Sequence, residues 1–176
     1  MIFLKAILHC DKEWGIGKRN GLMFNIPKDM KFFRETTLGH TVIMGSNTLL
    51  SFPGGRPLPK RNNIVLWPGG EKREDCTVVD SLDELFAEVA KCDPDDVFVI
   101  GGAMMYRTML PYCSEVLVTK VDAVGGADTF FPDLDENPDF VLAEESDHVE
   151  DGVVMLRFCT YKNTNTAELP KINEKN

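Results

Sequence analysis

The chain has 176 residues and a formal net charge of -9, so it has the size of one domain and lacks the basic field of a dedicated nucleic-acid binder. Its longest apolar runs are too short to cross a bilayer, and its start lacks the basic region and small-residue cleavage site of a signal peptide. Its five cysteines are an odd number with no close pair at metal-ligand spacing, so we expect free thiols in a reducing cytoplasm and no metal site.

Apolar runs, many of them β-branched, predict strands along most of the chain, and stretches with helical spacing lie between them. In chain order, the predicted strands are 2–9, 41–44, 63–67, 77–79, 96–100, 115–121, 140–146 and 153–161. The predicted helices are 28–37, 47–51, 82–91 and 103–110. The third helix has the clearest start, because Ser81 can cap it and Glu84 completes a capping box.

Strands that alternate with helices indicate a single α/β domain over residues 1–162, with a central, mostly parallel twisted sheet flanked by helices. The last two predicted strands surround the turn signal Glu150-Asp151-Gly152, so we expect them to form an antiparallel C-terminal hairpin. Residues 163–176 are polar, and we expect them to form a loose tail.

Asp29 is a carboxylate on an otherwise apolar helix face. Pro27 suits the first helical position, which places Asp29 in the first turn, and Met30 and Phe33 lie on its face or beside it. A buried carboxylate is costly, so Asp29 must be neutral, paired, or waiting for a hydrogen-bonding ligand. The simpler alternative is an acid that only complements the helix dipole.

Two predicted strands end in glycine turns that open a helix. Gly101-Gly102 follows the strand 96–100, and Gly45 follows the strand 41–44. Such turns bring backbone N–H groups and the positive helix end close to a ligand, although each is equally compatible with a tight turn or, at Ser46 to Thr48, with plain N-capping. The Gly-x-Gly-x-x-Gly pattern of the ordinary dinucleotide fold is absent.

Taken together, these segments resemble the dihydrofolate reductase family, and in particular its bacterial forms. The matching segments are Trp14 to Gly17, Asn25 to Phe33, Val42 to Gly45, Gly55 to Pro59, Arg61 to Leu66, Val99 to Ala103 with Tyr106, and Asp128 to Pro132. Their order and spacing match across about residues 2–161. The resemblance implies hydride transfer from NADPH to 7,8-dihydrofolate, which gives tetrahydrofolate.

The resemblance also implies roles for the substrate site. Asp29 would hydrogen-bond the pterin and favour its protonation through a water, and Thr119 would brace Asp29 from a neighbouring strand. Arg61 would bind the substrate's glutamate carboxylate, unless it is a solvated loop arginine, with Arg56 as a helper or only a turn residue. The remaining contacts would be the backbone carbonyls of Ile7 and Ile100 and the apolar walls formed by Met30, Phe33, Phe52 and Leu58.

The implied cofactor site joins the glycine turns to a loop over residues 16–22, which we expect to act as a mobile lid. Asp128 would steady this lid, unless it is only a surface acid. The implied cofactor contacts are His9, Ile16, Gly17, Asn20, Gly21 and Leu22, then Gly45, Ser46, Asn47, Thr48, Leu66 and Trp67, and last Gly101, Gly102, Ala103, Met104, Met105 and Tyr106.

Two departures from the family pattern affect the catalytic centre. Met23-Phe24 stands where the family usually has Pro-Trp, so Phe24 can wall the catalytic pocket but offers no indole N–H to a water. His9 stands where a small residue is common, either as a core histidine with a satisfied ring or as a group that narrows or polarises the site. We otherwise expect Asp29 to be the only acid or base in the pocket.

Two further departures affect the cofactor's 2′-phosphate. Ser46 replaces a common arginine, and Trp67-Pro68 replaces small hydroxyl residues, so NADH is not excluded as a cofactor. Lys72 and Arg73 either compensate from the following loop or are simply solvated.

The leading hypothesis is an NADPH-dependent dihydrofolate reductase, expected to act as a cytoplasmic monomer without nucleic-acid or membrane partners and to bind antifolates. One alternative is a pyrimidine reductase of riboflavin synthesis, which Asp29 and Arg61 disfavour. The other is a catalytically weak folate- or nucleotide-binding protein on the same fold.

Overall fold

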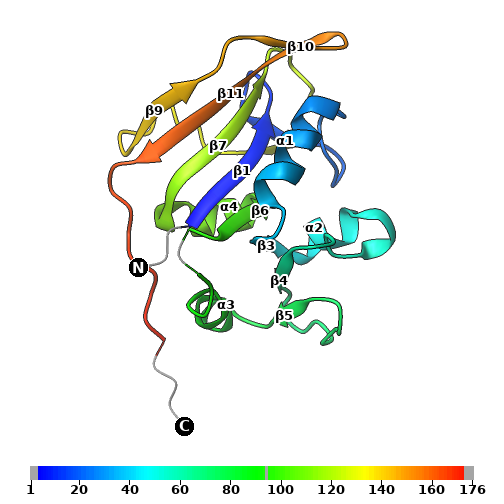
Figure 1. Cartoon of the computed structure of the whole chain (residues 1–176), viewed down its shortest axis with the longest axis vertical. Coiled ribbons are helices and arrows are strands. Elements are labelled where there is room, and N and C mark those ends of the chain that lie inside the picture. The colour runs from blue at the N-terminus through cyan, green and yellow to red at the C-terminus, as the bar shows by residue number, and fades with distance from the viewer. Residues whose placement is uncertain (1–3, 94, 173–176) are drawn as a thin grey trace.

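The centre of the molecule is a mixed, mostly parallel sheet. The structure is a computed structural model that describes residues 4–93 and 95–172. Within these residues the sheet has nine strands in the order β10-β11-β7-β1-β6-β3-β4-β5, with β9 also paired to β11 (Figure 1). The parallel strands are β1 (Leu4–Cys10), β3 (Thr41–Gly45), β4 (Asn62–Leu66), β5 (Thr77–Val79), β6 (Val97–Gly101) and β7 (Cys113–Val121). The antiparallel strands are β9 (Phe140–Glu145), β10 (Val149–Asp151) and β11 (Val154–Asn163).

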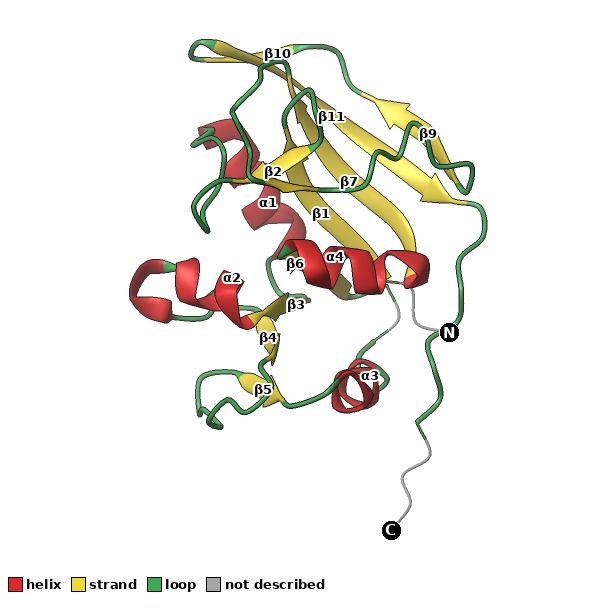
Figure 2. Ribbon diagram, turned by 180° about the vertical axis from the view of Figure 1, so that it is seen from behind, coloured by secondary structure: helices red, strands yellow, loops and turns green. Residues whose placement is uncertain are grey.

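Helices cover both faces of this sheet. The helices α1 (Pro27–Thr37) and α2 (Ser46–Ser51) belong to one face, and α3 (Leu82–Val89) and α4 (Ala103–Met109) to the other; α1 stands before the sheet in Figure 1 and α4 in Figure 2. Two 3-10 turns, η1 (Pro53–Gly55) and η2 (Leu110–Tyr112), follow α2 and α4. A separate pair of short strands, β2 (Gly15–Gly17) and β8 (Thr129–Phe130), joins two loops.

Side chains alternate along β1, so this strand contributes residues to the apolar clusters on both faces of the sheet. Leu4, Ala6, Leu8 and Cys10 enter the core that α3 and α4 cover, whereas Ile7 belongs to the cluster on the opposite face. Since side chains alternate along a strand, His9 lies on the same face as Ile7, toward α1.

The structure confirms the predicted fold class and corrects its details. The predicted helix 82–91 ends at Val89, and the short strands β2, β8 and β10 were not predicted. The turn signal at residues 150–152 does join two antiparallel strands, β10 and β11. Residues 2 and 3 of the first predicted strand lie outside the described residues.

The segment that follows β11 contacts the domain, although we expected a loose tail. The backbone N–H of Thr164 donates to the carbonyl of Asp139, and that of Ala167 donates to the carbonyl of Pro111. Leu169 and Ile172 pack against the main core. Residues 173–176 lie outside the described part of the chain. Within that part, no helix is long and apolar enough to span a membrane.

Candidate active site

An apolar cluster lies between α1 and the carboxyl ends of the central strands. Ligands of open α/β sheets bind at this edge, where parallel strands deliver their last residues. Of the side chains predicted to wall the pterin site, Met30 is instead 51% exposed and lies outside this cluster. The cluster contains the other predicted wall residues and both strand residues, namely Phe33, Phe52, Leu58, Ile7 and Ile100.

Asp29 and His9 form a buried pair beside this cluster. The carboxylate Oδ2 of Asp29 lies 2.8 Å from Nδ1 of His9. His9 is 7% exposed and Asp29 is 9% exposed, so the contact is shielded from solvent. Because an ionised carboxylate only accepts hydrogen bonds, the His9 Nδ1–H is the donor. Of the three states expected for a buried Asp29, the structure therefore shows the paired one, and its partner is His9.

Thr119 and Phe24 adjoin this pair. Thr119 is buried and stands opposite His9 in the ladder between β1 and β7. No hydrogen bond between Thr119 and Asp29 is found among the described residues, where His9 is the side chain bonded to Asp29. The ring centroid of Phe24 lies 6.0 Å from that of His9, so Phe24 borders the same space.

Tyr106 is hydrogen-bonded to the backbone of β1, the strand that carries His9. Its hydroxyl donates to the carbonyl of Ile7 at 2.8 Å. Burial raises the pKa of Tyr106 far above its usual value, and the nearby charge of Asp29 raises it further, so the phenol remains a donor. A carbonyl oxygen has two lone pairs, so Ile7 keeps one for a ligand.

Arg61 is held in place and is not a freely solvated loop arginine. Its Nε donates to Oγ1 of Thr37, Nη1 donates to the carbonyl of Pro59, and Nη2 donates to the carbonyl of Arg34 at the end of α1. Burial lowers the pKa of Arg61, and the charge of Arg34 lowers it further. Two of the five guanidinium N–H groups remain for an incoming carboxylate.

The two glycine turns meet at the end of β3 and β6. Gly101 has a φ of +136°, and a Cβ there would lie 3.2 Å from Oγ1 of Thr48. The N-caps of α2 and α4 are Gly45 and Gly102, and neither makes a side-chain capping bond. The alternative of N-capping by Ser46, Asn47 or Thr48 is therefore wrong. The first-turn N–H groups of α2 and α4 lack side-chain partners, as a phosphate site requires.

The remaining predicted cofactor residues surround these turns. Within α4, Met105 and Tyr106 are buried, while Met104 is largely exposed. Ala103 is the first residue of α4, and Leu66 ends β4 and is followed by Trp67.

The predicted lid is tied to the loop after β7. Lys18 and Gly21 exchange backbone hydrogen bonds, which folds Arg19 and Asn20 into a tight turn. This turn follows β2, which contains Ile16 and Gly17. Oδ2 of Asp128 accepts the backbone N–H of Arg19 at 2.9 Å, so the expected contact between Asp128 and the lid is present. Leu22 is exposed next to this turn.

Asp11 is a structural residue that the sequence analysis missed. Its carboxylate accepts the backbone N–H groups of Glu13, Gly15 and Gly125. Burial acts to raise the pKa of Asp11, but these three hydrogen bonds outweigh it and leave the pKa below its usual value. An acid just after a strand was the available signal, but its partner at Gly125 is remote in sequence.

The cations proposed to compensate for Ser46 and Trp67 are already engaged. Nζ of Lys72 donates to the carbonyl of Val78, and Arg73 bonds the carboxylate of Asp75 and the carbonyl of Gly55. Neither is a loose loop cation waiting for a phosphate.

A separate polar cavity of about 150 Å³ lies among Cys10, Trp14 and Arg157, away from α1. Lys12 pairs there with Asp122, and Lys120 pairs with Asp135. Within the described residues, no group of three or more His, Cys, Asp or Glu side chains is placed to hold a metal ion. Because the charged groups of this cavity pair with one another, the buried pair of His9 and Asp29 with the glycine turns is a stronger candidate site than the cavity.

The fold and the site together define a class: single-domain α/β proteins in which glycine-ended parallel strands meet a buried carboxylate. The family model described as dihydrofolate reductase matches residues 3–163. The dihydrofolate reductase of Bacillus subtilis (strain 168) is 36% identical over 167 residues, which cover 94% of this chain and 97% of the relative. That of Staphylococcus haemolyticus is 37% identical over 134 residues, which cover 74% of this chain and 78% of the relative. The chain belongs to the dihydrofolate reductase family.

A solved structure supports the same assignment. The dihydrofolate reductase from Enterococcus faecalis, complexed with NADP(H) and RAB-propyl, superposes with a TM-score of 0.81 at 31% identity. The match covers 92% of this chain and 96% of that chain.

Proposed function

We propose that this protein reduces 7,8-dihydrofolate to 5,6,7,8-tetrahydrofolate with NADPH as the hydride donor. The observation that carries the proposal is the buried carboxylate of Asp29, which stands at the head of α1 beside an apolar cluster. A carboxylate there matches the amino group and ring nitrogen of a pterin, and the apolar side chains match its flat ring.

Asp29 has the capacity to bind the pterin while it holds His9. A carboxylate offers about four lone-pair positions, and the His9 bond uses one, on Oδ2. The charge of Asp29 would favour the protonated pterin, and we expect a water to deliver the proton. Arg61 would bind the glutamate tail at the far end of α1 with its two remaining N–H groups.

The residues present fit a dinucleotide. The bound cofactor supplies the hydride. The open N-termini of α2 and α4 would hold its phosphates. A side chain at position 101 would crowd Thr48, so glycine there lets the two turns lie close together beside the cofactor. The turn at Lys18 to Gly21 would cover the nicotinamide and exclude water.

Three finer properties are part of the proposal. Antifolates should compete with dihydrofolate, because they would bind the same carboxylate. The five cysteines are all unpaired thiols, which favours a reducing cytoplasm. We also propose that the protein acts as a monomer.

The test is dihydrofolate-dependent oxidation of NADPH by the purified protein, with NADH as a parallel donor. We expect turnover with NADPH. Because Lys72 and Arg73 are engaged elsewhere, the preference over NADH should be modest. Tight folate binding without turnover would instead indicate a silent binding protein, and reduction of a riboflavin-pathway pyrimidine in place of dihydrofolate would indicate the disfavoured pyrimidine reductase.

A further inference from the structure

The imidazole of His9 has one nitrogen committed and one available. Nδ1 bonds Asp29, while Nε2 is buried and has no hydrogen-bond partner among the described residues. No other buried side-chain nitrogen or oxygen in residues 4–93 and 95–172 is left this way. Since buried polar atoms are nearly always hydrogen-bonded in folded proteins, Nε2 is suited to a partner that a ligand brings.

The bond to Asp29 sets what Nε2 can do. In the neutral tautomer that donates its Nδ1–H to Asp29, Nε2 carries a lone pair and acts as an acceptor. The matching ligand group is therefore an N–H donor. A reduced pterin and the carboxamide of a nicotinamide both provide one.

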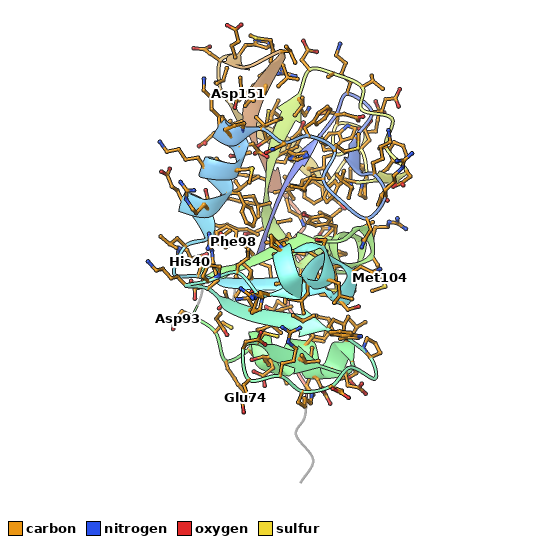
Figure 3. The ribbon with its side chains drawn as sticks, turned by 90° about the vertical axis from the view of Figure 1, so that its right-hand side faces the viewer. His40, Glu74, Asp93, Phe98, Met104 and Asp151 are labelled. Atoms are coloured by element: carbon orange, nitrogen blue, oxygen red, sulfur yellow. The ribbon has the colours of Figure 1, made fainter. Side chains whose placement is uncertain are left out.

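The position of His9 places this acceptor in the proposed site. His9 follows Ile7 by two residues on the same face of β1. Its ring is bordered by Asp29 and Phe24, and its backbone stands opposite Thr119 on β7. Each of these three neighbours belongs to the proposed pterin pocket. His40, by contrast, pairs with Asp96 in the same Nδ1-to-carboxylate manner but is half-exposed, and it lies next to Phe98 at the opposite end of the strands (Figure 3).

We propose that His9 is a positioning residue for Asp29 and that its Nε2 accepts a hydrogen bond from the N–H of the bound pterin or of the nicotinamide carboxamide. This inference rests on the proposed function. The Nδ1–H bond fixes the Asp29 carboxylate so that its free lone pairs face the pterin. The ring thus links the group that orients the substrate to a second contact with a ligand.

Two variants separate the two nitrogens. His9→Asn keeps an N–H donor near the position of Nδ1 but has no counterpart of Nε2, whereas His9→Phe keeps a ring and removes both. For His9→Phe we expect a loss of about tenfold to a hundredfold in kcat/KM. His9→Asn should restore kcat toward the wild-type value but keep a raised KM for the ligand that meets Nε2. His40→Asn is the matched control and should leave kcat and both KM values unchanged.

The NMR signals of the His9 ring nitrogens show which ligand, the pterin or the nicotinamide, donates the N–H group to Nε2. 7,8-Dihydrofolate and NADP⁺ are added separately to wild-type protein and to His9→Asn. We expect the Nε2 signal to shift with one of these probes, and the affinity of His9→Asn to fall for that same probe. A signal that neither probe moves would overturn the Nε2 contact, and wild-type kinetics for His9→Phe would overturn the positioning role. Absence of turnover in the wild type would overturn the proposed function and this inference together.

Discussion

At the scale of single residues, Asp29 is stabilised more by His9 than by its place at a helix start. A carboxylate in the first turn gains about 0.3–1 kcal/mol from the helix dipole, whereas a hydrogen bond to a charged group contributes about 1.5–3 kcal/mol. The buried 2.8 Å contact between Nδ1 of His9 and Oδ2 of Asp29 is of the second kind. This bond therefore fixes the orientation of the Asp29 carboxylate in a largely apolar site.

Asp29 could be predicted from the sequence, but its partner could not. A carboxylate on an apolar helix face is visible within eight residues. His9 lies 20 residues earlier, on a strand, and only the packing of α1 across β1 brings the two together. The resemblance pointed instead to Thr119, which lies on β7, the strand paired with β1. Which strands are neighbours could thus be predicted, but which side chain points at Asp29 could not.

Arg61 gives a prediction at this scale. Arg61→Lys removes the planar fork that pairs with a carboxylate, so we expect KM for dihydrofolate to rise about tenfold with kcat nearly unchanged. Steady-state kinetics measure this. A dihydropterin without a glutamate tail is the control and should show the same KM with both proteins. An equal rise for the tailless substrate would show that Arg61 only supports the end of α1.

At the scale of secondary-structure elements, the site depends on where strands stop. β3 and β6 are adjacent and parallel, and their glycine ends bring α2 and α4 to one place. Their apolar runs made both strands predictable. β2 and β8 have three and two residues, too few for a periodic pattern, and they form only because two distant loops meet. The pairing of β2 with β8 was therefore beyond prediction, although the resemblance had placed Asp128 beside the predicted lid.

Gly101 tests the glycine turns. Gly101→Ala places a Cβ at φ +136° and 3.2 Å from Oγ1 of Thr48. We expect a loss of stability of about 1–3 kcal/mol and a raised KM for NADPH, measured by urea unfolding and kinetics.

Gly39→Ala is the control for backbone strain alone. Gly39 has a φ of +79° with nothing within 4 Å of a Cβ, and it lies between α1 and β3. This variant should lose stability by roughly 1–2 kcal/mol with an unchanged KM for NADPH. Equal effects of both variants on KM for NADPH would contradict the proposal that Gly101 helps to bind the cofactor.

At the scale of the whole molecule, one buried acid joins the loops that frame the site. Asp11 ties the loop between β1 and β2 to the loop that follows β7 through three backbone hydrogen bonds. The segment after β11 adds Leu169 and Ile172 to the opposite core. Long-range contacts of this kind are set by tertiary packing, so the local polarity of residues 163–176 suggested a looser tail than its described part, up to residue 172, has.

Asp11 predicts a pH-dependent stability. Its folded pKa lies below its ordinary value of 3.8, so its contribution is fully present above that value and is lost as the pH falls through the folded pKa. Asp11→Asn should therefore lose about 1–3 kcal/mol at neutral pH, and its difference from wild type should shrink as the pH falls below 3.8 and through the lowered pKa of Asp11.

Urea unfolding at several pH values measures this difference. Asp147→Asn, an exposed acid on the surface, is the control and should match wild type throughout. A difference between Asp11→Asn and wild type that persists unchanged into acid would contradict the assigned role of the carboxylate.

The central claim is that Asp29 binds the pterin and favours its protonation, and kcat of Asp29→Asn as a function of pH tests it most directly. The Asn oxygen still accepts the His9 Nδ1–H, so the melting temperature should stay close to that of wild type. We predict a loss in kcat of about a hundredfold or more at neutral pH, shrinking in acid where the pterin is already protonated. An equal loss at every pH, or a protein that no longer folds, would contradict the claim.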